Sequence, residues 1–206
     1  EYITITDHSP SAFYAGGLDQ AKLALQWQEI AKAEESAGIR ILRGTESDIL
    51  ADGELDYAPE VLARFDVVIA SVHNRFGLDE ARTTRRLVRM MEQPLFKIWG
   101  HALGRLLHKR PPMACDVPAV LDAAARSRAA IEINGDPHRL DLEPRWIREA
   151  RKRGLRFTLS VDAHAARELG YLAYAAAMAR RAGVRRHEVL NALPAEAFAA
   201  AVRPAG

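Results

Sequence analysis

The chain has 206 residues, enough for one sizeable hydrophobic core, and its 49% apolar and 27% charged residues are ordinary for a globular protein. A formal net charge of +2 excludes recognition of nucleic acid by bulk electrostatics, so an anionic partner would have to bind at local arginines. The single Cys115 excludes an internal disulfide and favours the reducing cytoplasm, and no apolar run reaches the roughly 20 residues of a membrane span, so we expect no membrane partner.

Strands and helices are predicted in alternation along the chain. Apolar runs of β-type residues predict six strands, at 2–6, 39–42, 65–71, 95–99, 130–133 and from Phe157 onward. Helical spacing and cap residues predict helices at about 19–38, 79–92, 118–126, 144–154, 165–181 and 195–202, with a shorter one near 186–193. In the first helix, for example, Asp19 is the expected N-cap and Gly38 the expected end.

This alternation indicates an α/β fold with a parallel sheet, either a barrel or a doubly wound sheet. We see no internal repeat or linker, so we expect a single domain over residues 1–206. The chain lacks an initiator Met and starts directly in the strand-like run 2–6. We therefore expect it to be the C-terminal piece of a longer chain.

Metal-binding side chains follow the predicted strands. Just after each strand stand the residues His8, Glu46, His73, His101, Asn134, and Asp162 with His164. In parallel α/β folds the carboxyl ends of all strands lie on one face, so these side chains should converge there. Nitrogen and oxygen ligands without cysteine suit zinc, manganese or iron, and six ligands exceed what one tetrahedral zinc uses. The sequence therefore predicts a site for two or more metal ions.

The pair that ends the sixth strand is the clearest local signal. Residues i and i+2 of an extended segment point to the same side, so Asp162 and His164 can aim at one point. A single histidine at a strand end is more often a hydrogen-bonding or surface residue than a ligand. A chance explanation would have to hold at five strand ends together. The remaining histidines do not follow strands, and we assign them no metal role.

Seven short motifs, in the right order over nearly the whole chain, resemble the polymerase-and-histidinol-phosphatase domain, and more narrowly the version fused behind bacterial family X DNA polymerases. They are Thr-Asp-His at 6–8, Gly-Thr-Glu-Ser-Asp-Ile-Leu-Ala-Asp-Gly at 44–53, Ala-Ser-Val-His at 70–73, Gly-His-Ala-Leu-Gly-Arg-Leu-Leu at 100–107, Ile-Glu-Ile-Asn at 131–134, Arg-Leu-Asp-Leu at 139–142 and Asp-Ala-His at 162–164.

The resemblance implies a distorted (β/α)7 TIM-like barrel that is N-terminally incomplete in this chain, with up to three ions of Mn²⁺ or Zn²⁺. It implies a metal-dependent phosphoesterase, acting in those polymerases as a 3′–5′ exonuclease on a single-stranded DNA end, with the polymerase core upstream in the same chain. The family's first motif, a His-x-His, is absent here and should lie upstream. By motif, the metal ligands are His8, Glu46, His73, His101, Asp162 and His164.

Roles in phosphodiester hydrolysis can be assigned as hypotheses. Glu46 is the candidate bridging carboxylate and, with Asp162, the candidate catalytic pair. Substrate contacts are expected from Arg105, Asn134 and Arg139, although a surface or loop-stabilising role is as common for such residues. Exposed aromatics for base stacking are expected at 13–14 and at Phe76, and the basic run 82–89 offers a further DNA surface.

Two other functions remain open at this stage. One is a phosphatase for small phosphomonoesters, as in the histidinol phosphatase branch. The other is an inactive scaffold module. The stretches at 48–53 and 104–107 look like the polymerase-linked branch and favour the nuclease.

Overall fold

The computed structural model describes residues 1–204. Its six strands are β1 (Tyr2–His8), β2 (Arg40–Asp48), β3 (Val67–Ser71), β4 (Lys97–Trp99), β5 (Ala129–Asn134) and β6 (Phe157–Ser160). Its seven α-helices are α1 (Gln20–Ala37), α2 (Pro59–Leu62), α3 (Glu80–Glu92), α4 (Val117–Arg126), α5 (Pro144–Lys152), α6 (Leu172–Arg181) and α7 (Ala195–Val202). Four 3-10 helices complete the described fold, at η1 (Phe13–Ala15), η2 (Ala166–Tyr171), η3 (Arg186–Glu188) and η4 (Leu190–Ala192).

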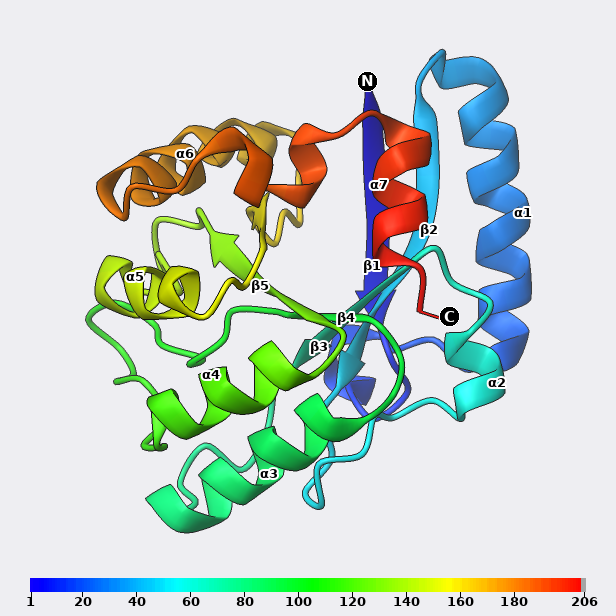
Figure 1. Cartoon of the computed structure of the whole chain (residues 1–206). Coiled ribbons are helices and arrows are strands. Elements are labelled where there is room, and N and C mark those ends of the chain that lie inside the picture. The colour runs from blue at the N-terminus through cyan, green and yellow to red at the C-terminus, as the bar shows by residue number, and fades with distance from the viewer. Residues whose placement is uncertain (205–206) are drawn as a thin grey trace.

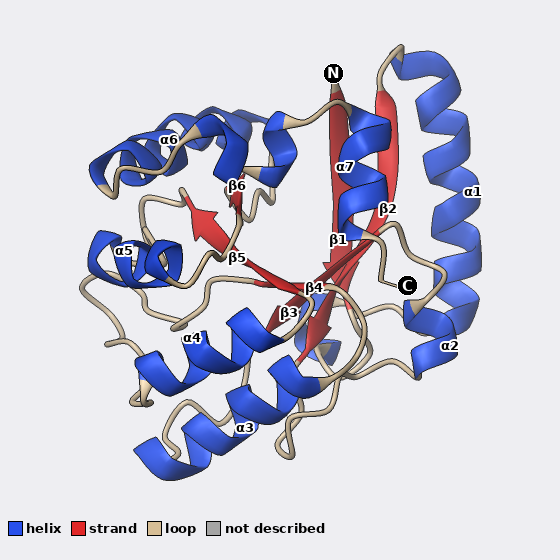
Figure 2. Cartoon of the chain, in the orientation of Figure 1, coloured by secondary structure: helices blue, strands red, loops and turns tan. Residues whose placement is uncertain are grey.

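The sheet is parallel throughout, and its spatial order follows the sequence, β1-β2-β3-β4-β5-β6. Each new strand adds to the same growing edge, as in a barrel, whereas a doubly wound sheet reverses its order part-way. The strands turn steadily across the molecule, so the sheet forms a curled half-barrel (Figures 1 and 2). The predicted α/β, TIM-like architecture is confirmed, and six strands of the expected seven-stranded barrel occur within residues 1–204.

Most predicted elements are confirmed, with some differences at their boundaries and one predicted helix divided in two. The first helix begins after Asp19, whose carboxylate accepts the Lys22 N–H at 2.9 Å, and ends at Gly38, which adopts φ 67°. The second strand is longer than predicted, because it continues through Gly44 to Asp48 and so contains Glu46. The helix expected at 165–181 divides into η2 and α6.

Two apolar clusters occupy opposite faces of the sheet. Neighbouring strand residues alternate between them, so that Val68, Trp99 and Ile131 pack under the outer helices. Their neighbours Val67, Ile98 and Ala130 pack on the other side against Phe198 and Val202 of α7. In Figure 1, α7 lies across the inner side of the curved sheet. It covers the beginnings of the strands and leaves their carboxyl ends free for a site.

The start of β4 holds a buried cation. The fully buried Lys97 donates from Nζ to the carbonyl oxygens of Met91 at 2.6 Å and Gln93 at 2.5 Å, at the C-terminal end of α3. These carbonyls lack helical partners, and a positive charge there is favourable to the helix dipole. Burial nevertheless lowers the pKa of Lys97 to about 8. Within the described chain, no helix is both long and apolar enough to cross a membrane.

Candidate metal centre

Three imidazoles converge on one buried carboxylate at the carboxyl end of the sheet. His8 closes β1 directly beside Glu46 of β2, to which it is paired in the sheet. The two Oε atoms of Glu46 lie 3.3 Å from His8 Nδ1, 3.2 Å from His73 Nε2 and 2.9 Å from His101 Nε2. The potential ligand atoms of His8, Glu46 and His73 all lie within 4.8 Å of one another. The predicted convergence of these four residues is therefore present in the fold.

The donor set fits a cation. Nε2 of His73 and Nε2 of His101 face each other at 3.2 Å, and both also face Glu46 Oε1, so one proton on either nitrogen cannot serve both contacts. His8 Nδ1 is buried and makes no well-directed hydrogen bond within the described residues. Nitrogen lone pairs and a carboxylate directed to one place are the ligands that zinc and manganese use in proteins. These residues therefore fit a metal ion.

The charges of the centre are strongly coupled. Burial alone would raise the pKa of Glu46, but hydrogen bonds and positive charge from His101 and His73 hold it well below its usual value. Burial would likewise lower the pKa of His73, yet Asp48 and Glu46 raise it to about 9. The carboxylates and imidazoles of the centre thus stabilise each other's charged forms.

Asp48 fixes the orientation of one imidazole. Its Oδ1 accepts the hydrogen bond of His73 Nδ1, and its Oδ2 accepts one from Asn74 Nδ2 at 3.3 Å. A carboxylate that holds one nitrogen of a histidine directs the other nitrogen toward a metal. We did not assign this role from the sequence. The signal was available, because Asp48 follows Glu46 by two residues in an extended strand and so lies on the same face.

Two more buried carboxylates hold the loop that carries His101. Glu132 of β5 accepts the His101 backbone N–H and hydrogen bonds from Ser160 and Asn134. Asp141 accepts the Leu103 backbone N–H at 3.0 Å. Burial raises the pKa of both carboxyl groups. Neither residue was assigned a role from the sequence, because their partners are distant in the chain and meet them only in the fold.

Asp162 and His164 lie differently from the expected pair. The strand β6 ends at Ser160 and Asp162 has φ 52°, so the segment is not extended as predicted, although His164 Nδ1 lies 3.8 Å from Asp162 Oδ1. The Asp162 carboxylate lies 3.1 Å from Arg139 Nε. The side chain of His164 is 69% exposed and its Nδ1 bonds to the Asp162 carbonyl at 2.8 Å. Their roles as metal ligands therefore stay predictions.

The three expected substrate contacts have different surroundings. The Arg105 guanidinium donates to the backbone carbonyls of Arg139, at 2.7 Å, and Leu140, and pairs with Glu143 at 3.0 Å. The fully buried Asn134 bonds to Glu132 and to the Asp136 N–H, which stabilises its loop. Arg139 has a buried Nη1 without a hydrogen bond to any described residue, and its Nε lies 3.1 Å from the Asp162 carboxylate.

The expected DNA-contacting surfaces are only partly free. Phe13 and Tyr14 of η1 are 83% and 63% exposed. Burial and the negative charges of Asp48 and Glu46 raise the pKa of Tyr14. Phe76 instead lies under the Arg110 guanidinium, at 3.6 Å from the ring centroid.

Within the basic run of α3, Arg86 is buried and its guanidinium is occupied by backbone carbonyls, including that of Leu50 at 2.8 Å. Arg89 pairs with Glu54 at 2.9 Å. These two arginines therefore have internal partners.

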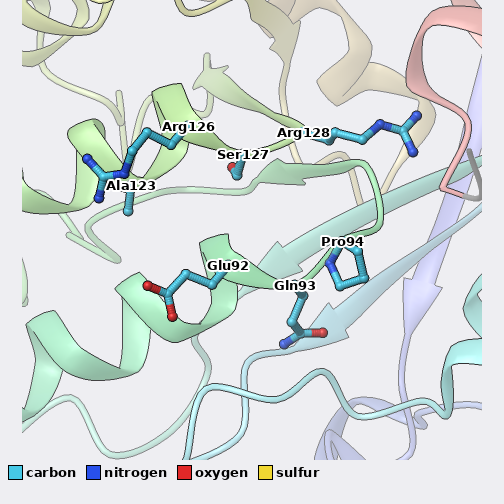
Figure 3. Close-up of a pocket in the computed structure, with 7 residues that line it drawn as sticks. All are labelled: Glu92, Gln93, Pro94, Ala123, Arg126, Ser127 and Arg128. Carbon is cyan, nitrogen blue, oxygen red and sulfur yellow. The ribbon is translucent and has the colours of Figure 1, made fainter.

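A pocket of about 280 Å³ lies at the opposite end of the sheet from the centre. It is lined by residues where α3 and α4 end and β5 begins, including Glu92, Arg126 and Arg128 (Figure 3). It shares no residue with the centre, and the active face of a parallel α/β sheet is the other one. We assign it no role in the chemistry.

Several proteins of known name are similar to this chain. It is 36% identical over 93% of its length to the "DNA polymerase/3′-5′ exonuclease PolX" of Bacillus subtilis, of which it spans 34%. The chain belongs to the polymerase-and-histidinol-phosphatase family. It is also 28% identical over 82% of its length to a probable phosphatase of Caldanaerobacter subterraneus, and 32% identical over 76% to one of Shewanella amazonensis. It spans 66% and 64% of those two proteins, and no protein-family model matches it.

This membership confirms the family expected from the seven motifs. The names of the relatives support a hydrolase that acts on phosphate esters. The half-barrel is consistent with the barrel fold of this family. The clustered His8, Glu46 and His73 support metal dependence. The chain spans about a third of the length of the PolX protein.

Proposed function

We propose that this chain acts as a metal-dependent 3′–5′ exonuclease on single-stranded DNA ends, as the partner of a family X polymerase core in DNA repair in the cytoplasm. The observation that carries the proposal is the set of three imidazoles facing the buried Glu46 carboxylate at 2.9–3.3 Å. The similarity to a protein named polymerase/3′-5′ exonuclease over 93% of the chain supports this choice of substrate.

The residues divide the chemistry among them. His8, Glu46, His73 and His101 would hold Mn²⁺ or Zn²⁺, with Asp162 and His164 as further ligands of up to three ions. Such ions lower the pKa of a bound water and neutralise phosphate charge. Asp48 keeps the His73 imidazole oriented, and Glu132 with Asp141 keeps the His101 loop in place. The Arg139 guanidinium, beside Asp162, would offer positive charge to a phosphate, and Tyr14 offers a face to the terminal base.

A small-molecule phosphatase is the second candidate, and the two relatives named probable phosphatases favour it. Hydrolysis rates should be compared with Mn²⁺ on a single-stranded oligonucleotide and on histidinol phosphate. We expect release of mononucleotides from the 3′ end and little turnover of the small ester. A preference for histidinol phosphate would overturn the nuclease.

A matched pair of variants ties any activity to the centre. Glu46→Gln keeps the size of the side chain and removes its charge, so we expect at least a 100-fold loss of turnover. Glu54→Gln makes the same change at an exposed carboxylate paired with Arg89, and its activity should match that of the wild type. Equal activity in both variants, or no activity with either substrate, would support the scaffold alternative instead.

A further inference from the structure

A second hollow, which we call the arginine groove, lies between α5 and α6. It has a volume of about 360 Å³, and its charged and apolar walls are formed by Arg105, Glu143, Arg145, Arg148, Met178 and Arg181. The two helices lie near each other on one side of the sheet (Figure 1), and Arg148 reaches the backbone of Arg181 at 3.5 Å. Four arginines and one glutamate in one hollow give it a strong excess of positive charge.

The positive charge of the groove is not balanced locally. Glu143 pairs with two of its arginines, Arg105 at 3.0 Å and Arg145 at 2.8 Å. Arg148 and Arg181 are exposed and have no carboxylate within 4 Å among the described residues. Two neighbouring guanidiniums without counter-charges repel each other, and an anion with two charged groups along its length would relieve this.

Direct contacts connect the groove to Asp162, one of the predicted metal ligands. Arg105, at one end of the groove, donates from Nε to the Arg139 carbonyl at 2.7 Å. Arg139 in turn places its own Nε 3.1 Å from the Asp162 carboxylate. A chain of phosphates that leaves the centre past Arg139 would therefore meet the arginines of the groove next.

Beyond the groove, the α6 side of the molecule continues with aromatic surface. Tyr171, Tyr174, Met178 and Arg181 follow one another at helical spacing of three or four residues, so they line one face. The rings of Tyr171 and Tyr174 lie 6.0 Å apart, and Tyr174 is 50% exposed. Alternating arginines and exposed aromatic rings are the features with which proteins bind single strands, since guanidiniums take the phosphates and rings stack with bases.

We infer that the arginine groove binds the single-stranded DNA that lies 5′ to the end held at the metal centre. Arg148 and Arg181 contact the backbone phosphates, and Tyr174 stacks with a base. This inference rests on the proposed nuclease function for the identity of the ligand. It assigns the strand a definite path, along the α5–α6 side of the molecule.

Binding of a labelled 20-nucleotide single strand tests the groove without any need for turnover. Fluorescence anisotropy in EDTA should give a Kd at least fivefold weaker for Arg148→Gln/Arg181→Gln than for the wild type. The slope of log K against log salt should become shallower by about 0.7 for each phosphate that the variant no longer neutralises. The matched control is Arg126→Gln/Arg128→Gln, which removes two arginines from the pocket of Figure 3. Its Kd should stay within twofold of the wild type.

If DNA binding were weakened equally in both double variants, or in neither, the assignment of the arginine groove as a DNA-binding site would be wrong. A melting temperature equal to that of the control excludes misfolding as the cause, and the single variant Arg181→Gln provides a milder version of the same test. Tyr174→Leu should weaken binding of the oligonucleotide but not of polyphosphate, because only the former has bases. Tighter binding of a duplex than of the single strand would also contradict the inference.

The nuclease function and the groove can fail separately. Hydrolysis of bis(p-nitrophenyl) phosphate with Mn²⁺ by the wild type reports the chemistry at the centre alone. Absence of this activity together with a groove-dependent Kd would overturn the nuclease and keep the binding path. Hydrolysis together with a Kd that is the same in the groove variants and the wild type would keep the nuclease and overturn the binding path.

Discussion

Asp162 lies at a bend in the chain, in a backbone conformation that most residues adopt only at a cost in free energy. Its φ of 52° is left-handed, a region that Asp tolerates better than most residues, and its side chain faces Arg139 at 3.1 Å. We expect Asp162→Ala to lower nuclease turnover at least 100-fold, because the proposed oxygen ligand is lost together with the 3.1 Å ion pair to Arg139. The fold should change little in circular dichroism.

The matched control for this change is Asp122→Ala, which breaks an ion pair with Arg153 away from the centre. Turnover by this variant should equal that of the wild type. Undiminished hydrolysis by the Asp162 variant would remove the residue from the catalytic assignment.

The buried Lys97 should make the stability of the protein depend on pH. Burial lowers its pKa from 10.5 to about 8, so the unfolded chain binds this proton more tightly than the folded chain. The wild type should therefore gain stability as the pH rises from 8 towards 10.5, and the penalty is fully present below pH 8. Relative to Lys97→Met, which does not titrate, the free energy of unfolding should rise by about 2 kcal/mol between pH 7 and pH 10.

Urea unfolding of both proteins at several pH values measures this difference, and the reference variant cancels the titration of other groups. A difference that stays constant with pH would show that the two carbonyl partners of Lys97 keep it charged in the fold.

At the scale of the element, β2 positions the centre. It runs from Arg40 to Asp48 beside β1, and Gly44 allows the two strands to approach. A Cβ added at Gly44 would lie 2.6 Å from Thr6 Cγ2 and 2.9 Å from the Ile5 carbonyl oxygen. We expect Gly44→Ala to destabilise the protein by about 1–3 kcal/mol through overpacking. It should also weaken metal binding, because His8 and Glu46 are paired two residues further along.

Urea unfolding and metal content of the purified variant check both effects. Gly170→Ala is the control, since a Cβ there meets nothing within 4 Å. Full metal content together with reduced stability would show that the strands separate without disturbing the centre.

The sequence was sufficient for the order of the elements, because period-two and helical patterns are local signals. It was also sufficient to predict that His8, Glu46, His73 and His101 lie together, because parallel topology brings all strand ends to one face. It did not show that the extended backbone stops at Ser160 and that Asp162 adopts a left-handed conformation. The roles of Glu132 and of the arginines of α5 and α6 could not be predicted, because these residues meet partners that are distant in sequence.

At the scale of the whole molecule, the proposed ligands come from β1, β2 and the loops that follow β3 and β4, which are brought together only in the fold. A metal ion held there would bind the native state and not the unfolded chain, so it should stabilise the whole protein. At a free Mn²⁺ or Zn²⁺ concentration about 100 times the Kd, the expected gain in unfolding free energy is about 2.7 kcal/mol. Removal of metal by a chelator should lower the melting temperature by several degrees.

Thermal unfolding with and without metal measures this coupling. Glu46→Gln should abolish most of the metal-dependent shift, because the carboxylate that all three imidazoles face is neutralised. Glu54→Gln should keep the shift, since that carboxylate lies outside the centre. If the wild type showed no shift with either metal, His73 and His101 would have to share their contact through a proton alone, and the metal centre itself would be wrong.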